Sequence, residues 1–206
     1  MVKLFDKITG TTTSFDSEGV TDSTANWKTD QFKEWWVTID GTEYLITSNN
    51  ATKLFFSNSI SSNNSYIIAF VGREFLTQTE SDASNVIKIP DALIAKKYNQ
   101  ANFDLSNKIF SYLRGLYRQD FDPLEQIFNI YAMQQSFAYL VLAKIYQDLM
   151  IDQESFEGFK GYNMYEKSYN DGINDSLSLL QIDLDKDGVV DVEEEKGFLS
   201  STILAR

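Results

Sequence analysis

Acidic side chains near the C-terminus have a spacing that suits a divalent cation. Asp183, Asp185 and Asp187 alternate with other residues, Gly188 follows, and Glu194 closes the run. A hard divalent cation takes about six to eight oxygen ligands, and alternate residues of a tightly turning loop point toward its centre. Glycine permits the sharp turn. The spacing predicts a metal-binding loop, and the alternative is a solvated acidic surface.

The run matches every fixed position of the EF-hand calcium-loop pattern D-x-[DN]-x-[DN]-G-x5-E. In such a loop the seventh residue offers its backbone carbonyl, the ninth binds through water, and the closing glutamate binds with both oxygens. The sequence shows no second loop of this kind, and Gly197 interrupts the exit segment. We therefore expect a structural Ca²⁺ that fastens the end of the chain, not a sensor. The expected ligands are Asp183, Asp185, Asp187, Val189, Asp191 and Glu194.

Composition excludes several kinds of chemistry. The chain of 206 residues contains no cysteine and no histidine. Disulfides, thiolate zinc sites, imidazole metal ligands and Ser-His-Asp triads are therefore impossible. A pair of carboxylates could serve a glycosidase, but no pair stands out from the metal pattern. We expect that the protein is not an enzyme.

The charge balance disfavours nucleic-acid binding. The formal net charge is −12, and affinity for phosphates requires clustered lysine and arginine. A wall past which DNA slides without adhering would also be acidic. The N-terminus lacks the apolar run of a signal peptide, and no stretch reaches the length of a membrane helix. These features predict a soluble protein made in a cytoplasm, without a membrane partner.

The first part of the chain, residues 1–85, has the pattern of an antiparallel β module with an N-terminal arm. Residues 35–39 and 42–49 are strand candidates, and Asp40-Gly41 between them is a strong hairpin signal. Further strands are expected at 51–58 and 65–72. The first 26 residues could form an arm or irregular edge strands. The polar stretch 77–85 is expected to be a linker.

The second part, residues 86–206, is expected to be a helical bundle that ends in the calcium loop at 183–194. Pro90 suits the start of one helix, and Asp104 could cap a second. Asp122, Pro123 and Glu125 form a helix-start signal. Apolar residues at three- and four-residue spacing then predict the longest helix, to about Met150. A further helix is expected over 153–181, although Gly158, Gly161 and Gly172 lower its propensity. The predicted fold class is α+β.

Residues 27–56 resemble a module found in structural proteins of tailed bacteriophages. The shared pattern is a tryptophan, an aromatic-rich strand that ends in V-x-I, and then Y-x-I-x-S-N-x-x-T-x-L. The alternative is a generic hairpin with buried aromatics, and in either case Trp27, Trp36 and Tyr44 should be largely buried. The matching residues are Trp27, Trp36, Val37, Ile39, Tyr44, Ile46, Ser48, Asn49, Thr52 and Leu54.

The helical part, with FAYLVLAKIYQDLM followed by FEGFKGYNMYEKSYNDGINDSL, resembles head-to-tail connector proteins of these phages, also called adaptor or head-completion proteins. The resemblance implies a neck subunit of the virion that forms a homo-oligomeric ring between portal and tail. It implies portal and tail or neck proteins as partners, with assembly in the host cytoplasm. DNA would only pass through. Alternatives are another tail, baseplate or capsid-decorating subunit, or a calcium-stabilised carbohydrate-binding module that uses the aromatics of residues 35–39.

Overall fold

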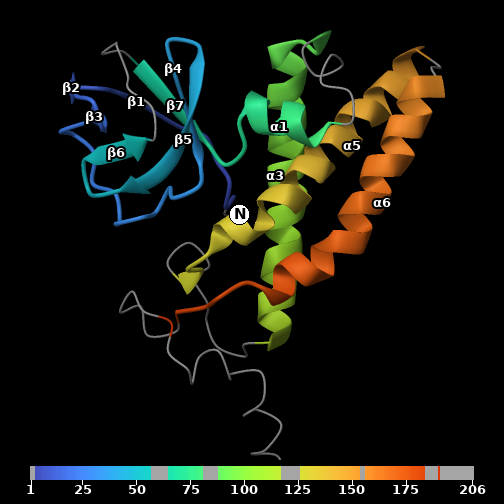
Figure 1. Ribbon diagram of the computed structural model, residues 1–206. Helices are drawn as coiled ribbons and strands as arrows, with labels where there is room; N and C mark the ends of the chain where they lie inside the picture. The colour runs from blue at the N-terminus through green and yellow to red at the C-terminus, as the bar shows by residue number, and fades with distance from the viewer. Residues whose placement is uncertain are drawn as a thin grey trace, which may run out of the picture. The chain divides into compact units, whose positions relative to one another are not determined.

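The computed structural model describes residues 3–56, 65–80, 88–116, 126–153, 156–183 and 190. It confirms the α+β class, because an antiparallel sheet occupies the N-terminal half and helices occupy the C-terminal half (Figure 1). The chain divides into two compact units. One is Phe5–Leu93, called the β unit, and the other joins Met1–Leu4 to Ile94–Arg206, called the helical unit. The predicted boundary between residues 85 and 86 lies outside the described residues.

The β unit contains a sheet in which every pair of neighbouring strands is antiparallel, in the order β1-β7-β4-β5-β6-β3-β2. The first 26 residues supply three of these strands, so they belong to the sheet. β5 pairs with β4 and β6, has a register irregularity between Ile46 and Ser48, and bends along its length in Figure 1. The strands are β1 (Ile8–Thr11), β2 (Ser14–Phe15), β3 (Gly19–Thr21), β4 (Trp36–Ile39), β5 (Thr42–Asn49), β6 (Lys53–Phe56) and β7 (Ser65–Ala69).

The hairpin between β4 and β5 forms where the sequence predicts it. Ile39 pairs with Thr42, and the two turn residues between them have positive φ angles, 50° at Asp40 and 79° at Gly41. Both angles fit a type I′ turn, in which asparagine, aspartate and glycine are favoured. Local sequence therefore determines the register of this hairpin.

Aromatic side chains form a continuous series of ring contacts in the β unit. Phe5 stacks on Phe70 at 4.4 Å between ring centroids, Phe70 meets Trp35 at 5.1 Å, and Trp35 meets Phe32 at 5.5 Å. The predicted burial is correct for Trp36, which is 8% exposed. Trp27 and Tyr44 are only half-buried. The deepest aromatic positions also include Phe32, which the sequence pattern did not single out.

A short helix, α1 (Arg73–Thr79), occupies the start of the predicted linker, so that prediction is wrong for residues 77–79. Its first backbone N–H groups are satisfied by a side chain from β5. The Glu43 carboxylate accepts hydrogen bonds from the N–H of Arg73 at 2.8 Å and of Glu74 at 2.7 Å. A carboxylate at a helix N-terminus also interacts favourably with the helix dipole. This cap is invisible in local sequence because Glu43 lies some thirty residues earlier. Residues 81–85 of the predicted linker lie outside the described residues.

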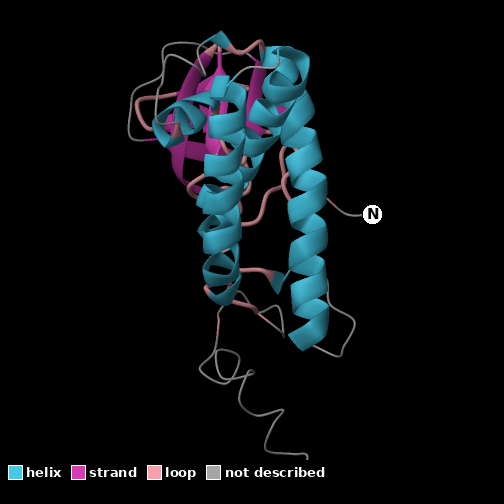
Figure 2. Cartoon of the chain, turned by 90° about the vertical axis from the view of Figure 1, so that its right-hand side faces the viewer, coloured by secondary structure: helices cyan, strands magenta, loops and turns pink. Residues whose placement is uncertain are grey.

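The helical unit contains three long helices, two of which differ from the prediction among the described residues. α3 (Asp91–Leu116) is continuous, so Asp104 lies inside one helix and does not cap a second. The predicted helix from Pro123 to Met150 is interrupted at Ile127–Asn129. A 3-10 turn, η1 (Ile130–Met133), then leads into α5 (Gln134–Gln153). α6 (Phe156–Ser178) confirms the last predicted helix, and α5 and α6 run antiparallel, side by side (Figures 1 and 2).

Candidate metal centre

Asp183, the first predicted calcium ligand, is buried where the described helical unit ends. Only 5% of the residue is exposed, which is unusual for an aspartate. Its backbone N–H donates to the carbonyl of Gln126 at 2.8 Å. The chain therefore enters the predicted loop from a fixed point, with the first carboxylate already withdrawn from bulk water.

A two-stranded clamp produces this anchor. Ile127 and Ile182 form an isolated antiparallel bridge, and the N–H of Phe128 donates to the carbonyl of Gln181 at 2.9 Å. The Asn129 side chain completes the clamp: its amide donates to the Leu179 carbonyl at 2.8 Å, and its Oδ1 accepts from the Gln181 N–H at 2.7 Å. We call residues 126–129 and 179–183 the end clamp.

The end clamp explains why the long predicted helix is interrupted. Asn129 has φ −120° and ψ 51°, outside the helical region. Its side chain bonds the backbone some fifty residues later, and asparagine side chains compete with helical hydrogen bonds in this manner. In the sequence, Asn129 before an apolar run indicates a possible helix break at this position. Apolar residues at helical spacing on both sides of Asn129 favoured one continuous helix instead.

The remaining predicted ligands Asp185, Asp187, Val189, Asp191 and Glu194 lie outside the described residues. Val190, within the predicted loop, is half-buried. Within the described ranges, no group of three or more acidic side chains is placed to hold a metal ion. The structure therefore describes how Asp183 is positioned, and the donor set of the loop stays a prediction.

A second polar feature is a cleft of about 650 Å³ in the helical unit, lined by residues of α3 and α5 together with Lys3. Four of its charged side chains form ion pairs between the two helices. Lys97 Nζ lies 2.6 Å from Asp148, and Lys144 Nζ lies 2.5 Å from Asp104. The Lys97 side chain is only 5% exposed, so losing one partner would leave a buried charge unpaired, which is strongly destabilising. These ion pairs fasten α3 to α5.

A buried carboxylate, Asp22, joins two segments of the β unit. It is 4% exposed, accepts hydrogen bonds from the N–H and hydroxyl of Thr24, and accepts one from the Tyr66 hydroxyl at 2.7 Å. Burial by itself would raise the pKa of Asp22, but the hydrogen bonds from Thr24 and Tyr66 outweigh it and hold the pKa below its usual value. Asp22 is therefore ionised at neutral pH and organises the chain around it.

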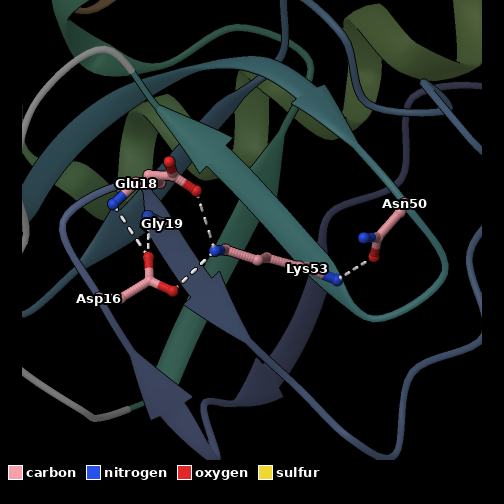
Figure 3. Close-up of polar contacts among 5 residues, drawn as sticks. All are labelled: Asp16, Glu18, Gly19, Asn50 and Lys53. Carbon is pink, nitrogen blue, oxygen red and sulfur yellow. Dashed lines mark hydrogen bonds and ion pairs between the residues drawn. The ribbon is translucent and has the colours of Figure 1, made fainter.

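A third cluster, on the surface of the β unit, ties the turn before β3 to β6 (Figure 3). Asp16 Oδ1 accepts from the N–H groups of Glu18 and Gly19, and its Oδ2 pairs with Lys53 Nζ at 2.7 Å. The hydrogen bond with Lys53 is the main reason that the pKa of Asp16 is lowered, and the same bond raises the pKa of Lys53. Gly19 is required there, because an added Cβ would lie 1.9 Å from the Leu54 carbonyl oxygen.

The tryptophans of residues 35–39 are packed inside the β unit. Trp35 is 5% exposed and Trp36 is 8% exposed. A sugar-binding platform needs an exposed aromatic face, so neither ring provides one in this structure.

Comparison with known proteins gives no relative: no protein-family model, curated protein or solved structure matches the chain. Among the described residues, no helix combines the length and apolar character required to cross a membrane.

Proposed function

We propose that the chain is a structural subunit of a tailed-phage virion, a neck or head-to-tail connector that assembles as a ring between portal and tail. The phage-like pattern of residues 27–56 supports this proposal through the way its residues are used. Trp36, Val37, Ile39, Ile46 and Leu54 are core residues of the β unit. These buried residues stabilise the fold of the β unit, and a stable fold is what a structural subunit requires.

Asn49, another residue of the phage-like pattern, also stabilises the fold of the β unit. It is 2% exposed, accepts from the N–H of Phe32 at 2.8 Å, and donates to the carbonyls of Lys28 and Asn50. Residues 28–35 include positive φ angles at Asp30 and Glu34. A single buried amide therefore fixes an irregular segment against the end of β5.

The observation that carries the proposal is the use of ionisable side chains to join separate segments. Lys97 and Lys144 fasten α5 to α3. Asp22 bonds Tyr66, and Glu43 caps α1. In each case the charge is neutralised or hydrogen-bonded by the protein itself. Such groups stabilise a scaffold, whereas a catalytic site aims charges at a substrate.

The acidic composition fits a passage for DNA. With a net charge of −12, the wall of a ring would repel phosphates, and the genome would slide without being held. We propose α5 and the calcium-loop end for the lumen side, and the β unit for contacts with neighbouring rings. The Ca²⁺ would be bound by Asp183 and the other predicted ligands, and would fasten the end clamp.

The test is assembly. The full chain, alone or mixed with a phage portal protein, should form rings visible by electron microscopy, with a mass by light scattering that for the chain alone is a multiple of 23.6 kDa. The chain should also fail to shift duplex DNA on a gel at low salt, where non-specific electrostatic binding is strongest. A portal or terminase gene beside its own gene would add support. A ring wall dominated by lysine and arginine, or a subunit on the capsid exterior far from the axis, would contradict the proposal.

Location in the virion, oligomeric state and glycan binding distinguish the alternative functions from a connector. Another tail, baseplate or capsid-decorating subunit would appear elsewhere in the virion. A calcium-stabilised carbohydrate-binding module would remain a monomer and retain glycans on an array, and the burial of Trp35 and Trp36 disfavours it.

A further inference from the structure

The strand order of the β unit implies that its sheet is rolled up. β1 and β2 lie at opposite ends of the order, yet only Thr12 and Thr13 separate them in the chain. The opposite edges of a flat sheet of this size would lie about 29 Å apart, because neighbouring strands are about 4.8 Å apart. The three Cα–Cα steps from Thr11 to Ser14 span at most about 11 Å. The two edges of the sheet therefore meet at this corner.

β1 and β2 act as one bent strand that closes the sheet. β1 pairs with β7, and β2 pairs with β3 on its other side, with Ser14 opposite Thr21. Continuing this antiparallel register places Asp22 opposite Thr13, and the Ser23 N–H donates to Thr13 Oγ1 at 3.1 Å. Residues 22–24 therefore lie beside the end of β1. We call the boundary between β1 and residues 22–24 the seam.

The Tyr66 side chain crosses β1 to reach the seam. Tyr66 of β7 is the register partner of Gly10 in β1, and its hydroxyl donates to Asp22 Oδ2 at 2.7 Å. An added Cβ at Gly10 would lie 2.2 Å from the Tyr66 hydroxyl oxygen, so the tyrosine ring passes over the glycine. This side chain therefore joins β7 to the residue that follows β3, across the strand between them. We call Tyr66, Gly10 and Asp22 the latch.

The seam has a different kind of hydrogen bonding from the rest of the sheet. Neighbouring strands elsewhere in the described sheet are joined by ladders, but the ladder between β2 and β3 ends at Thr21. Beyond it, the described links are the backbone bond from Thr13 to Thr21 at 2.7 Å, the bond from Ser23 to the Thr13 side chain, and the latch. Local opening begins where cooperative backbone contacts are few. The seam is therefore the expected place for the β unit to open first.

We propose that the β unit is a closed barrel that opens at the seam, and that the latch holds the seam shut. When Tyr66 and Asp22 are bonded, residues 22–24 and the tyrosine cover the edge of β1. When they separate, that edge is exposed, and an exposed strand edge is a template for pairing with another chain. The latch thus protects the β unit against edge-to-edge association. The inference does not depend on the connector proposal.

Amide hydrogen exchange of the full chain, followed by mass spectrometry, tests the seam. Peptides from residues 8–24 should exchange faster than peptides from residues 36–49, which form the β4–β5 hairpin. Their exchange should also depend less on urea, because local opening exposes less surface than global unfolding. Tyr66→Phe and Asp22→Asn should each raise exchange at residues 8–24 by at least about tenfold, as expected for loss of a hydrogen bond to a charged group. The double variant should exchange no faster than the more affected single variant, because both changes remove the same bond.

Ile46→Val is the matched control. Ile46 is fully buried in β5, which is separated from the seam by other strands on both sides. Removing one methylene there weakens the core, so exchange at residues 36–49 should rise through global unfolding while exchange at residues 8–24 stays near wild type. Circular dichroism and melting temperatures check that every variant is folded. The inference is overturned by a seam that exchanges with the rate and urea dependence of the hairpin, or that responds as strongly to Ile46→Val as to Tyr66→Phe.

Gly10→Ala tests the latch without altering either hydrogen-bonding group. The added methyl group would occupy the space of the Tyr66 ring and displace its hydroxyl from Asp22. Exchange at residues 8–24 should therefore rise at least about tenfold, as it does in Tyr66→Phe. Unchanged exchange in a folded Gly10→Ala variant would show that the tyrosine does not cross β1, and would overturn the latch.

Discussion

At the scale of single residues, buried polar groups hold together segments that have little regular structure of their own. Asp22 and Asn49 are 4% and 2% exposed, and both accept hydrogen bonds from backbone N–H groups of irregular segments. A buried polar group without a partner is costly, so each such residue specifies one arrangement of the chain around it. The sheet therefore tolerates a long irregular connection between β3 and β4.

Tyr66→Phe should lower the free energy of unfolding by about 1.5–3 kcal/mol, the usual range for a hydrogen bond to a charged group. The substitution removes the donor 2.7 Å from Asp22 Oδ2 and leaves a buried carboxylate with fewer partners. Urea unfolding monitored by tryptophan fluorescence measures the change. Tyr131→Phe, at an exposed tyrosine, is the control and should be close to neutral. Equal effects of the two substitutions would show that the Asp22–Tyr66 bond contributes nothing.

Tyr169 should make the protein sensitive to alkali. Burial raises its pKa to about 12, with a smaller contribution from the nearby Asp104 carboxylate. A tyrosine whose folded pKa is raised stabilises the fold fully below its unfolded pKa of about 10, and that contribution is lost as pH rises toward the folded value. Wild type should therefore lose more stability than Tyr169→Phe between about pH 10 and 12. Urea unfolding at several pH values, with phenolate absorbance, gives both quantities, and parallel losses in the two proteins would refute the assignment.

At the scale of elements, α6 forms although its sequence contains three glycines, and packing gives the reason for one of them. An added Cβ at Gly161 would lie 2.4 Å from the Tyr146 ring, so the absence of a side chain allows α5 and α6 to approach. Tyr146 also stacks on Tyr165 of α6 at 5.6 Å between centroids. At Gly172, nothing lies within 4 Å of an added Cβ.

These two glycines of one helix should respond oppositely to alanine. Gly172→Ala should raise the free energy of unfolding by about 0.5–1 kcal/mol, because alanine reduces the freedom of the unfolded chain and fits the helix. Gly161→Ala should lower it by about 1–3 kcal/mol, as overpacking does. Thermal or urea unfolding of both variants decides the matter. Stabilisation by both substitutions would mean that the α5–α6 contact adjusts freely.

At the scale of the whole molecule, charged side chains are distributed unevenly along the sequence. Acidic residues outnumber basic ones by 30 to 18, yet residues 126–143 and 176–182 contain no charged side chain, and the acidic predicted loop begins directly beyond residue 182. Binding a divalent cation in that loop would neutralise carboxylates next to the end clamp. We therefore expect metal binding to affect stability at this end of the helical unit.

Calcium should raise the melting temperature, because a ligand that binds only the folded state stabilises it, by about 2.7 kcal/mol at a concentration one hundred times the dissociation constant. Asp183→Ala and Glu194→Gln should abolish the gain. Asp175→Ala, an exposed aspartate outside the loop, should preserve it. Calorimetric titration and melting curves with and without chelator provide the measurement. Absence of both calcium heat and chelator sensitivity would show that the loop binds no metal.

The elements that could be read from the sequence are those set by neighbouring residues. Asp40-Gly41 places a turn whose positive φ angles few other residues adopt, and alternating apolar residues then specify β4 and β5. The sequence also predicts a helix where the structure has one from Phe156 to Ser178. In the hairpin and in α6 the signal and the structure lie within a short stretch of chain. The acidic spacing is a signal of the same local kind, because ligand geometry is encoded within twelve consecutive positions, and the metal loop stays a prediction.

Tertiary structure decided the features that depend on distant partners. α3 continues through Asp104, whose side chain pairs with Lys144 of another helix, whereas the sequence offers it equally as a helix cap. α1 begins where Glu43 supplies a carboxylate from β5. The helix expected from Pro123 is interrupted because Asn129 bonds residues some fifty positions later. The burial of Asp183 and the exposure of Phe128 and Leu179 arise from the same clamp, since hydrogen bonds between remote backbones determine which side chains face water.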